Sequence, residues 1–447
     1  MGRVRLVVAV FLAVVAPAAA QAQAGGDLEV RGFVLGNLAS RFGGEHPPGP
    51  EGGTLLLGEA RARLDLEWWA DAVELSAVLR ADAIFDGVAS DLDADLREAY
   101  LDYSTGPIDL RGGRQIVTWG IGDLLFINDV FPKDWVSFFS GRPLEYLKLG
   151  ADALRVRYSS PAVNGEVVVM PRFQPDNLPA ASRFFFFDPF AGVAARDEVK
   201  PLASLANTEV AVRAYRRVGG LDITGYAYRG FWRSPGAIPD AVGLPDAPSP
   251  PARPGAVLDA AGLAGQPVLP AHLTLFYPPL SVYGASAQGN LLRGVVSFEI
   301  GYYDSRQDRS GTDPAVPNSQ TRFLIGYQRQ LAQELTVGLQ YYAELMLNHA
   351  GYRSSLPAGF PAQGRYRDTV TVRLTQLLKH QTWRLSLFAF VSPADADYLL
   401  IPEASYRLSD RLSATVGANV FGGERDTTFL GQFDRNDNAY AALRFDF

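Results

Sequence analysis

The sequence predicts an all-β fold: a transmembrane antiparallel β-barrel of 18 strands, with 16 as the alternative count. Three observations predict it. Apolar and polar side chains alternate at every second position in many segments, the connections between these segments alternate between short and long, and no long apolar run follows the first 25 residues. The mean hydropathy of +0.00 suits strands that face hydrocarbon on one side and water on the other.

The clearest alternation lies in residues 58–70. The odd positions carry Glu59, Arg61, Arg63, Asp65 and Glu67, and the even positions between them are apolar. Alternate side chains of a strand point to opposite faces, so one face is charged and the other suits lipid. A helix would spread the same charges around its whole circumference.

Weaker copies of this pattern complete a set of 18 predicted strands. The whole set covers 27–38, 58–70, 72–85, 95–104, 107–116, 150–159, 163–171, 206–217, 220–231, 281–289, 292–304, 320–330, 335–345, 366–378, 381–391, 397–408, 412–420 and 437–447. Tight turns such as Gly219-Gly220 alternate with long connections such as 117–149 and 232–280. Outer-membrane barrels have short periplasmic turns and long external loops, whereas sandwiches and propellers need no such asymmetry.

The two ends of the chain predict export to the bacterial outer membrane. Arg3 and Arg5 precede an apolar stretch and small residues, which predicts a signal peptide over residues 1–23 and one barrel domain over 24–447. The last residue, Phe447, ends an alternating strand. Such an ending is typical of the signal that outer-membrane proteins present to the barrel-assembly machinery, and outer-membrane lipid is the expected surrounding.

The long connection 117–149 is rich in apolar and aromatic residues, and so is 172–190. Loops this apolar are poorly suited to water, so we expect one or both to fold into the lumen and narrow it. The predicted constriction residues are Trp119, Asp123, Phe126, Asp129, Lys133, Asp134 and Trp135. The acidic run Asp91, Asp93 and Asp95 lacks the rest of a calcium-loop pattern, so we expect a solvated external loop there.

Charged residues at inward positions gather on the strands of the N-terminal half. The predicted pore-lining residues are Glu59, Arg61, Arg63, Asp65, Arg80, Glu98, Asp102, Arg111, Arg114, Gln115, Arg155, Arg157 and Arg213. Arginines and carboxylates on neighbouring strands either pair and brace the wall, or leave arginines free to attract an anionic solute. Bracing is the favoured interpretation for any single residue, because acids nearly match arginines on these strands.

Composition argues against several other classes of function. The chain has no cysteine, and its four histidines fall in predicted loops or turns. The sequence therefore shows no thiolate metal site, no acyl-transfer set and no metal-ligand cluster, and we expect neither a cofactor nor an enzyme. A net charge of −7 gives no reason to expect nucleic acid as a partner.

The stretch Leu96–Gly120, LREAYLDYSTGPIDLRGGRQIVTWG, resembles a segment of alginate-export-type and related porin-like outer-membrane proteins of Gram-negative bacteria. The resemblance implies an 18-stranded barrel that passes a solute. Alginate exporters have a strongly cationic lumen, whereas acids are interleaved here, so alginate is not implied. Alternation places Arg114 outward, unless a bulge at Gly112-Gly113 turns Arg114 or Gln115 toward the lumen. We predict that bulge.

These observations predict a porin-like channel for passive or facilitated passage of a small polar or anionic solute. Two alternatives remain open. One is an export conduit for a polysaccharide or hydrophobic compound, working with periplasmic or inner-membrane partners. The other is a closed structural or adhesion barrel. The sequence leaves the solute, the direction of transport and homo-oligomerisation open.

Overall fold

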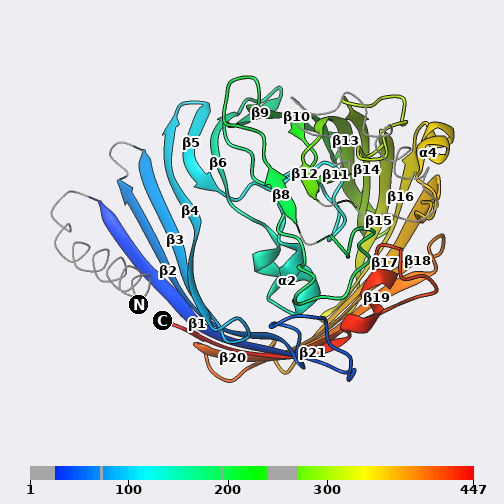
Figure 1. The fold of residues 1–447 in the computed structure, drawn as a ribbon. Coiled ribbons are helices and arrows are strands. Elements are labelled where there is room, and N and C mark those ends of the chain that lie inside the picture. The colour runs from blue at the N-terminus through cyan, green and yellow to red at the C-terminus, as the bar shows by residue number, and fades with distance from the viewer. Residues whose placement is uncertain (1–25, 71–73, 194, 240–269, 271) are drawn as a thin grey trace.

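A computed structural model describes residues 26–70, 74–193, 195–239, 270 and 272–447. The predicted signal peptide lies outside these residues. Within them, 18 strands form one antiparallel sheet that closes on itself, because the first strand pairs with the last as well as with the second (Figure 1). The transmembrane barrel and its strand number, predicted from the alternation, are confirmed.

The barrel strands are β1 (Asp27–Arg41), β2 (Leu55–Ala70), β3 (Leu75–Asp86), β4 (Asp91–Thr105), β5 (Ile108–Gln115), β6 (Ala151–Tyr158), β7 (Asn164–Met170), β9 (Glu209–Val218), β10 (Leu221–Phe231), β13 (Pro279–Leu291), β14 (Gly294–Ser305), β15 (Gln320–Ala332), β16 (Leu335–Met346), β17 (Tyr366–Leu378), β18 (Trp383–Ser392), β19 (Asp397–Arg407), β20 (Leu412–Gly423) and β21 (Asn438–Asp446). Every predicted strand overlaps one of them. The run Asp91, Asp93 and Asp95 lies in β4, so the prediction of an external loop there is wrong.

Alternation along the strands separates the two faces of the wall. On β1, Val34 and Leu38 are exposed, whereas their neighbours Phe33, Leu35 and Asn37 are almost fully covered. The first set points outward to lipid and the second points into the barrel. No helix in the described part of the chain is long and apolar enough to cross a membrane.

One strand pair carries an irregularity near the predicted bulge. Arg80 of β3 pairs with Glu98 of β4, but Ala81 pairs with Leu96, so Arg97 is an extra residue on β4. Both Arg97 and Glu98 line a cavity inside the barrel. An extra residue of this kind re-aims side chains, as a β-bulge does.

The neighbouring strand β5 pairs with β4 and β6 without a register shift, so the prediction of a bulge at Gly112-Gly113 is wrong. Gln115 therefore points inward by alternation, where its amide donates to the Ala153 carbonyl at 3.0 Å. Arg114 stays on the outward face. There it donates to the carbonyl of Leu96, at the irregular part of β4, and lies 3.5 Å from Asp152.

Two long connections fill much of the barrel. Residues 116–150, called here the lumen segment, contain helix α2 (Trp135–Ser140) and the 3-10 turn η2 (Leu144–Leu147), and α2 lies inside the ring of strands (Figure 1). The second connection packs on the first, as Asn177 pairs with Asp134. The expectation that one or both loops fold inward is confirmed for both.

The other connections hold small elements that the sequence did not predict. A three-stranded sheet joins β8 (Arg196–Val199), β11 (Gly236–Pro239) and β12 (Leu273–Phe276) among the long connections. Helix α4 (His349–Ser355) follows β16, and the 3-10 turn η3 (Gly431–Asn436) precedes β21. All of them belong to the long connections, which in barrels of this architecture leave the strands at the external rim.

Candidate pore and constriction

The first part of the lumen segment is held by one buried carboxylate. Glu299 of β14 accepts hydrogen bonds from the backbone N–H groups of Ile121, Gly122 and Asn128 at 2.8, 3.2 and 2.9 Å. The amide of Asn128 adds a fourth at 2.9 Å. Glu299 has no exposed surface, so these donors replace the water that an ionised carboxylate requires.

A glycine makes this arrangement possible. Gly120 has φ +79°, and a Cβ there would lie 2.8 Å from a carboxylate oxygen of Glu299. A residue with a side chain would be strained in this conformation and would crowd the anchor. In the sequence G-I-G-D at 120–123, the first glycine thus allows the backbone to approach the carboxylate of Glu299 closely.

Further polar contacts tie the lumen segment to opposite sides of the wall. Trp119 donates to Glu166 of β7 at 2.9 Å. Asp123 accepts two bonds from Arg373 of β17, at 2.8 and 2.7 Å. Since β7 and β17 stand far apart in the order of the sheet, the segment crosses the lumen.

Helix α2 is fixed at both ends. Asp134 caps its start by accepting from the backbone N–H of Ser137 at 3.2 Å. Gly141 ends it in the left-handed conformation, with its hydrogen side against the ring of Tyr440. The Gly141 carbonyl accepts from the amide of Asn37 on β1 at 3.2 Å. Asp134, a predicted constriction residue, is thus the N-cap of α2.

One face of α2 packs on an apolar stretch of the inner wall. Phe139 stacks on Phe433 with ring centroids 4.2 Å apart, and Phe138 meets Phe390 of β18 edge-on at 5.7 Å. The cluster also includes Phe184 of the second connection, together with wall residues Phe388, Leu399 and Phe421. The inner wall of β18–β21 therefore carries a hydrophobic core instead of an aqueous surface.

A buried ion cluster lies beside α2. The Lys133 ammonium lies 2.9 Å from Asp129 and also donates to the carbonyls of Asp129 and Phe131 at 3.0 and 2.7 Å. Lys148 contacts the other oxygen of Asp129 at 2.8 Å. Burial lowers the pKa of Lys133, while Asp129 opposes that shift. The ring of Phe126 lies 4.5 Å from the Lys133 ammonium, and Trp135 packs beside Phe126.

Three arginines surround Tyr146 of η2. The guanidinium carbons of Arg61, Arg63 and Arg97 lie 4.0, 4.9 and 4.7 Å from its ring centroid. Burial raises the pKa of the Tyr146 hydroxyl. This cluster attaches η2 to β2 and β4 by cation–π contacts.

Carboxylates compensate the same arginines. Asp82 contacts Arg61 at 2.5 Å and Arg63 at 2.7 Å, and Glu59 contacts Arg61 and Arg142 at 2.9 and 2.8 Å. The side chains of Glu59, Arg61 and Arg63 are at most 7% exposed. They lie between the wall and the lumen segment, where they brace the structure.

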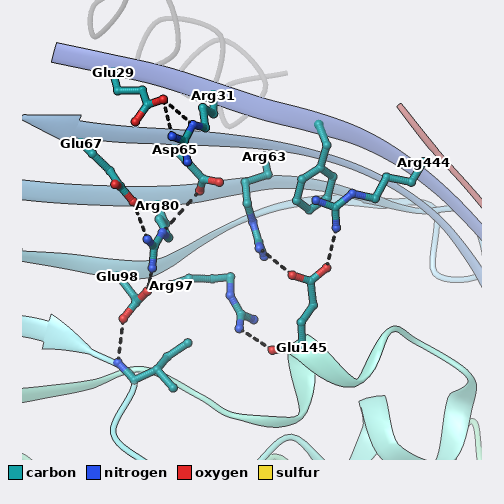
Figure 2. Close-up of a pocket in the computed structure, with 12 residues that line it drawn as sticks. Glu29, Arg31, Arg63, Asp65, Glu67, Arg80, Arg97, Glu98, Glu145 and Arg444 are labelled. Atoms are coloured by element: carbon teal, nitrogen blue, oxygen red, sulfur yellow. Dashed lines mark hydrogen bonds and ion pairs between the residues drawn. The ribbon is translucent and has the colours of Figure 1, made fainter. Parts of the chain in front are cut away.

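A cavity of about 350 Å³ lies between the lumen segment and the inner wall of β1–β4 and β21. Figure 2 shows its charged lining: Arg80 bridges Glu67 and Glu98, and Glu145 of the lumen segment receives Arg63 at 3.3 Å and Arg444 at 3.0 Å. Asp65 lies at its edge, 3.9 Å from Arg80. The cavity carries both signs of charge, and most of them are paired.

The inner wall of β4–β9 continues the charged surface. Arg111 pairs with Asp102 through two bonds of 2.6 Å, while Arg157 and Arg213 share Glu166 at 3.4 and 3.0 Å. Arg155 stands directly across from Arg111 in the sheet. Among the described residues, the side chain of Arg155 makes no hydrogen bond and no ion pair, and the carboxylates of Glu166 and Asp102 act on its charge only at longer range.

A second cavity of about 530 Å³ lies at the external rim. Its walls are mostly apolar and include Phe190 and Phe360, whose ring centroids are 5.6 Å apart. Polar groups gather at one side: Arg367 lies 3.2 Å from Asp395 and 5.1 Å from the ring of Phe429. We call this cavity the vestibule.

Comparisons with known proteins agree on the fold. Pseudomonas aeruginosa OccD3 (OpdP) superposes with a TM-score of 0.53 at 8% identity, covering 94% of this chain and 91% of that one. Acinetobacter baumannii OccAB3 gives a TM-score of 0.50 at 10% identity, covering 94% and 99%. This chain has the fold of an outer-membrane porin.

No family model and no curated protein sequence matches this porin-like barrel. The resemblance of Leu96–Gly120 to alginate-export-type proteins is therefore not shown by these comparisons. What they add is the architecture: a porin-like β-barrel fold.

Sequence reasoning located the lumen segment but missed its main anchors. Glu299, Tyr146 and Arg97 were not among the predicted site residues, yet they contact the segment or belong to it. Glu299 stands alone among uncharged neighbours on its strand, which is a weak signal. No pattern could pair it with Gly120, because the contact depends on barrel closure.

Proposed function

We propose that this protein is an outer-membrane channel for a small anionic or polar solute, and that the lumen segment sets its narrowest point. The anchoring of the segment across the barrel carries the proposal. Contacts to β1, β7, β14 and β17 hold it in the lumen. A loop fixed in this way reduces an 18-stranded barrel, otherwise wide, to a selective passage.

The distribution of charge supports a preference for anions. Most arginines of the inner wall brace it by pairing with carboxylates, as Arg111 does with Asp102. Arg155 is different, because its side chain makes no ion pair or hydrogen bond with the described residues, and Glu166 and Asp102 act on it only at longer range. In a water-filled tube with low-dielectric walls, a charge without an ion-pair partner attracts solutes of the opposite sign. Arg155 is therefore the residue that we assign to selectivity.

The two cavities suggest where a solute pauses. The vestibule is apolar with polar groups at one side, and the cavity over β1–β4 and β21 is lined mainly by charged residues. A solute with an apolar body and a polar or anionic end complements the vestibule. Passage of such a solute needs no catalytic group or cofactor.

Single-channel recording in planar bilayers tests the channel. We expect the folded wild-type protein to conduct in small steps, and a variant lacking 121–147 to conduct in steps several times larger. If neither protein conducts, the channel proposal fails and a closed structural or adhesion barrel replaces it. Large steps from the wild type, unchanged by the deletion, would contradict the role of the lumen segment.

A substitution tests the selectivity. Arg155→Gln should lower the ratio of anion to cation permeability, measured as a reversal potential in a salt gradient. Arg216→Gln is the matched control, because Arg216 of β9 is exposed and points outward by alternation. An equal shift in both variants, or none in Arg155→Gln, would contradict the assignment.

A further inference from the structure

A cluster of arginines lies on the outer, lipid-facing side of the barrel, at the rim with the long loops. Arg229 of β10 points outward by alternation and is exposed. It pairs in register with Ser281 of β13, which pairs with Asp304 of β14. Arg306 and Arg309 follow directly after β14, so five residues form one row across three neighbouring strands.

The charges in this row do not balance. Asp304 is the one carboxylate of the five, and it is engaged by Arg309 through two bonds of 2.8 and 2.7 Å. Arg229 has no ion-pair or hydrogen-bond partner within the residues that the structure describes. The row therefore presents two positive charges in excess, on a surface where the strands below are apolar.

Arg306 provides a second, independent indication. One guanidinium nitrogen, Nη2, donates to the Gly230 carbonyl at 2.8 Å. Its Nε is buried and has no partner among the described atoms. A buried donor without an acceptor is costly, and an oxygen-rich ligand would supply the missing acceptor.

Two tyrosines mark the depth of the row in the membrane. Tyr283 and Tyr302 point outward one step closer to the barrel's middle, and their exposed fractions are 55% and 40%. Tyrosines on the outer face of a barrel form the aromatic girdle at the boundary between hydrocarbon and headgroups. The arginine row consequently lies at headgroup level of the outer leaflet.

We propose that Arg229, Arg306 and Arg309 bind the phosphate groups of a phosphorylated glycolipid in the outer leaflet, of the lipid A type. Arginine's fork pairs with phosphate oxygens in a charge-assisted, bidentate geometry. Tyr283 and Tyr302 pack against the start of the acyl chains. The site is independent of the lumen and of any conducted solute.

The test uses the full-length folded protein in detergent and measures bound lipid by native mass spectrometry. The probes are bisphosphorylated lipid A and the same lipid after removal of both phosphates. We expect the wild type to bind the phosphorylated form at least about tenfold more tightly, the effect of one to two charge-assisted contacts. The double variant Arg229→Gln/Arg309→Gln should bind both forms alike.

Arg216→Gln is the matched control, since Arg216 is also outward and exposed but pairs with Ile223 near the short-turn rim. It should keep the wild-type ratio, and heat-modifiable migration on gels confirms that each variant is folded. Equal binding of both lipids to the wild type overturns the proposal, as does an equal loss in the control. If millimolar inorganic phosphate displaces the lipid completely, the site recognises free phosphate and the lipid assignment is wrong.

Discussion

The lumen segment meets the barrel through two unlike surfaces. On one side α2 buries Phe138 and Phe139 against the aromatic wall of β18–β21. On the other side, backbone N–H groups and charged side chains of the segment form hydrogen bonds with a few wall residues, chiefly Glu299 and Arg373. The first surface is large and non-directional, and the second consists of a few contacts with fixed geometry.

This difference separates stability from position. Burial of aromatic rings contributes most of the free energy, yet it tolerates small shifts of the helix. A carboxylate that accepts four hydrogen bonds loses some of them when the backbone shifts, so Glu299 determines where the segment crosses the lumen. We therefore expect apolar substitutions to affect mainly the free energy of unfolding, and polar substitutions to affect mainly the conductance.

The largest effect is expected on the apolar side. Phe139→Ala removes a ring that is 2% exposed and stacks on Phe433. The free energy of unfolding should fall by about 3–5 kcal/mol, measured by denaturant titration in lipid vesicles. Phe139→Leu is the control and should recover most of the loss. Unchanged stability in Phe139→Ala would show that the ring is not packed as described.

The anchor carboxylate should give a smaller change in stability and a larger one in conductance. Glu299→Ala leaves four donors without their acceptor, which should cost about 2–3 kcal/mol once lumen water replaces part of the bonding. The displaced segment should produce larger and noisier single-channel steps. Glu299→Gln keeps one acceptor oxygen, so its stability and its single-channel steps should lie between those of the wild type and Glu299→Ala. Wild-type steps in Glu299→Ala would contradict the anchoring role.

Gly120 tests the same anchor from the side of the segment. Gly120→Ala places a Cβ beside Glu299 at φ +79° and should cost about 1–2 kcal/mol. Gly112→Ala is the matched control, because a Cβ at Gly112 would meet no atom within 4 Å. Equal unfolding free energies for the two variants would argue against the close approach.

The smallest change in stability is expected at the half-exposed pair of Arg373 and Asp123. Their side chains are 35% and 38% exposed, so Arg373→Gln should cost less than about 1 kcal/mol. The conductance should still change, because the pair holds the part of the lumen segment around Asp123 against β17. The double variant Arg373→Gln/Asp123→Asn should match the single one. A stability loss as large as that of Phe139→Ala would contradict the comparison.

The sequence predicted the barrel well, because its signal is local. Alternation over residues 58–70 is visible in the residues themselves, and the same rule placed every strand of the barrel. The apolar content of the lumen segment also predicted its inward fold. Which strands the segment touches could not be predicted, since Glu299 lies more than 170 positions from the backbone that it binds.

The irregularity near Arg114 shows the same limit on a smaller scale. The two glycines of β5 suggested a bulge there, but the extra residue is Arg97 on the neighbouring strand. Register is a property of a pair of strands, so one strand's composition cannot decide which partner carries the extra residue. The small sheet of β8, β11 and β12 escaped prediction because its strands are four residues long.

The absence of cysteine from the chain permits a direct test of the constriction. In Leu124→Cys the single thiol lies on the half-buried edge of the lumen segment, and in Leu443→Cys it lies on the lipid face of β21. We predict that a negatively charged thiosulfonate reagent reduces the single-channel conductance of Leu124→Cys strongly and leaves Leu443→Cys unchanged. Full conductance after complete labelling of Leu124→Cys would show that the solute does not pass the lumen segment.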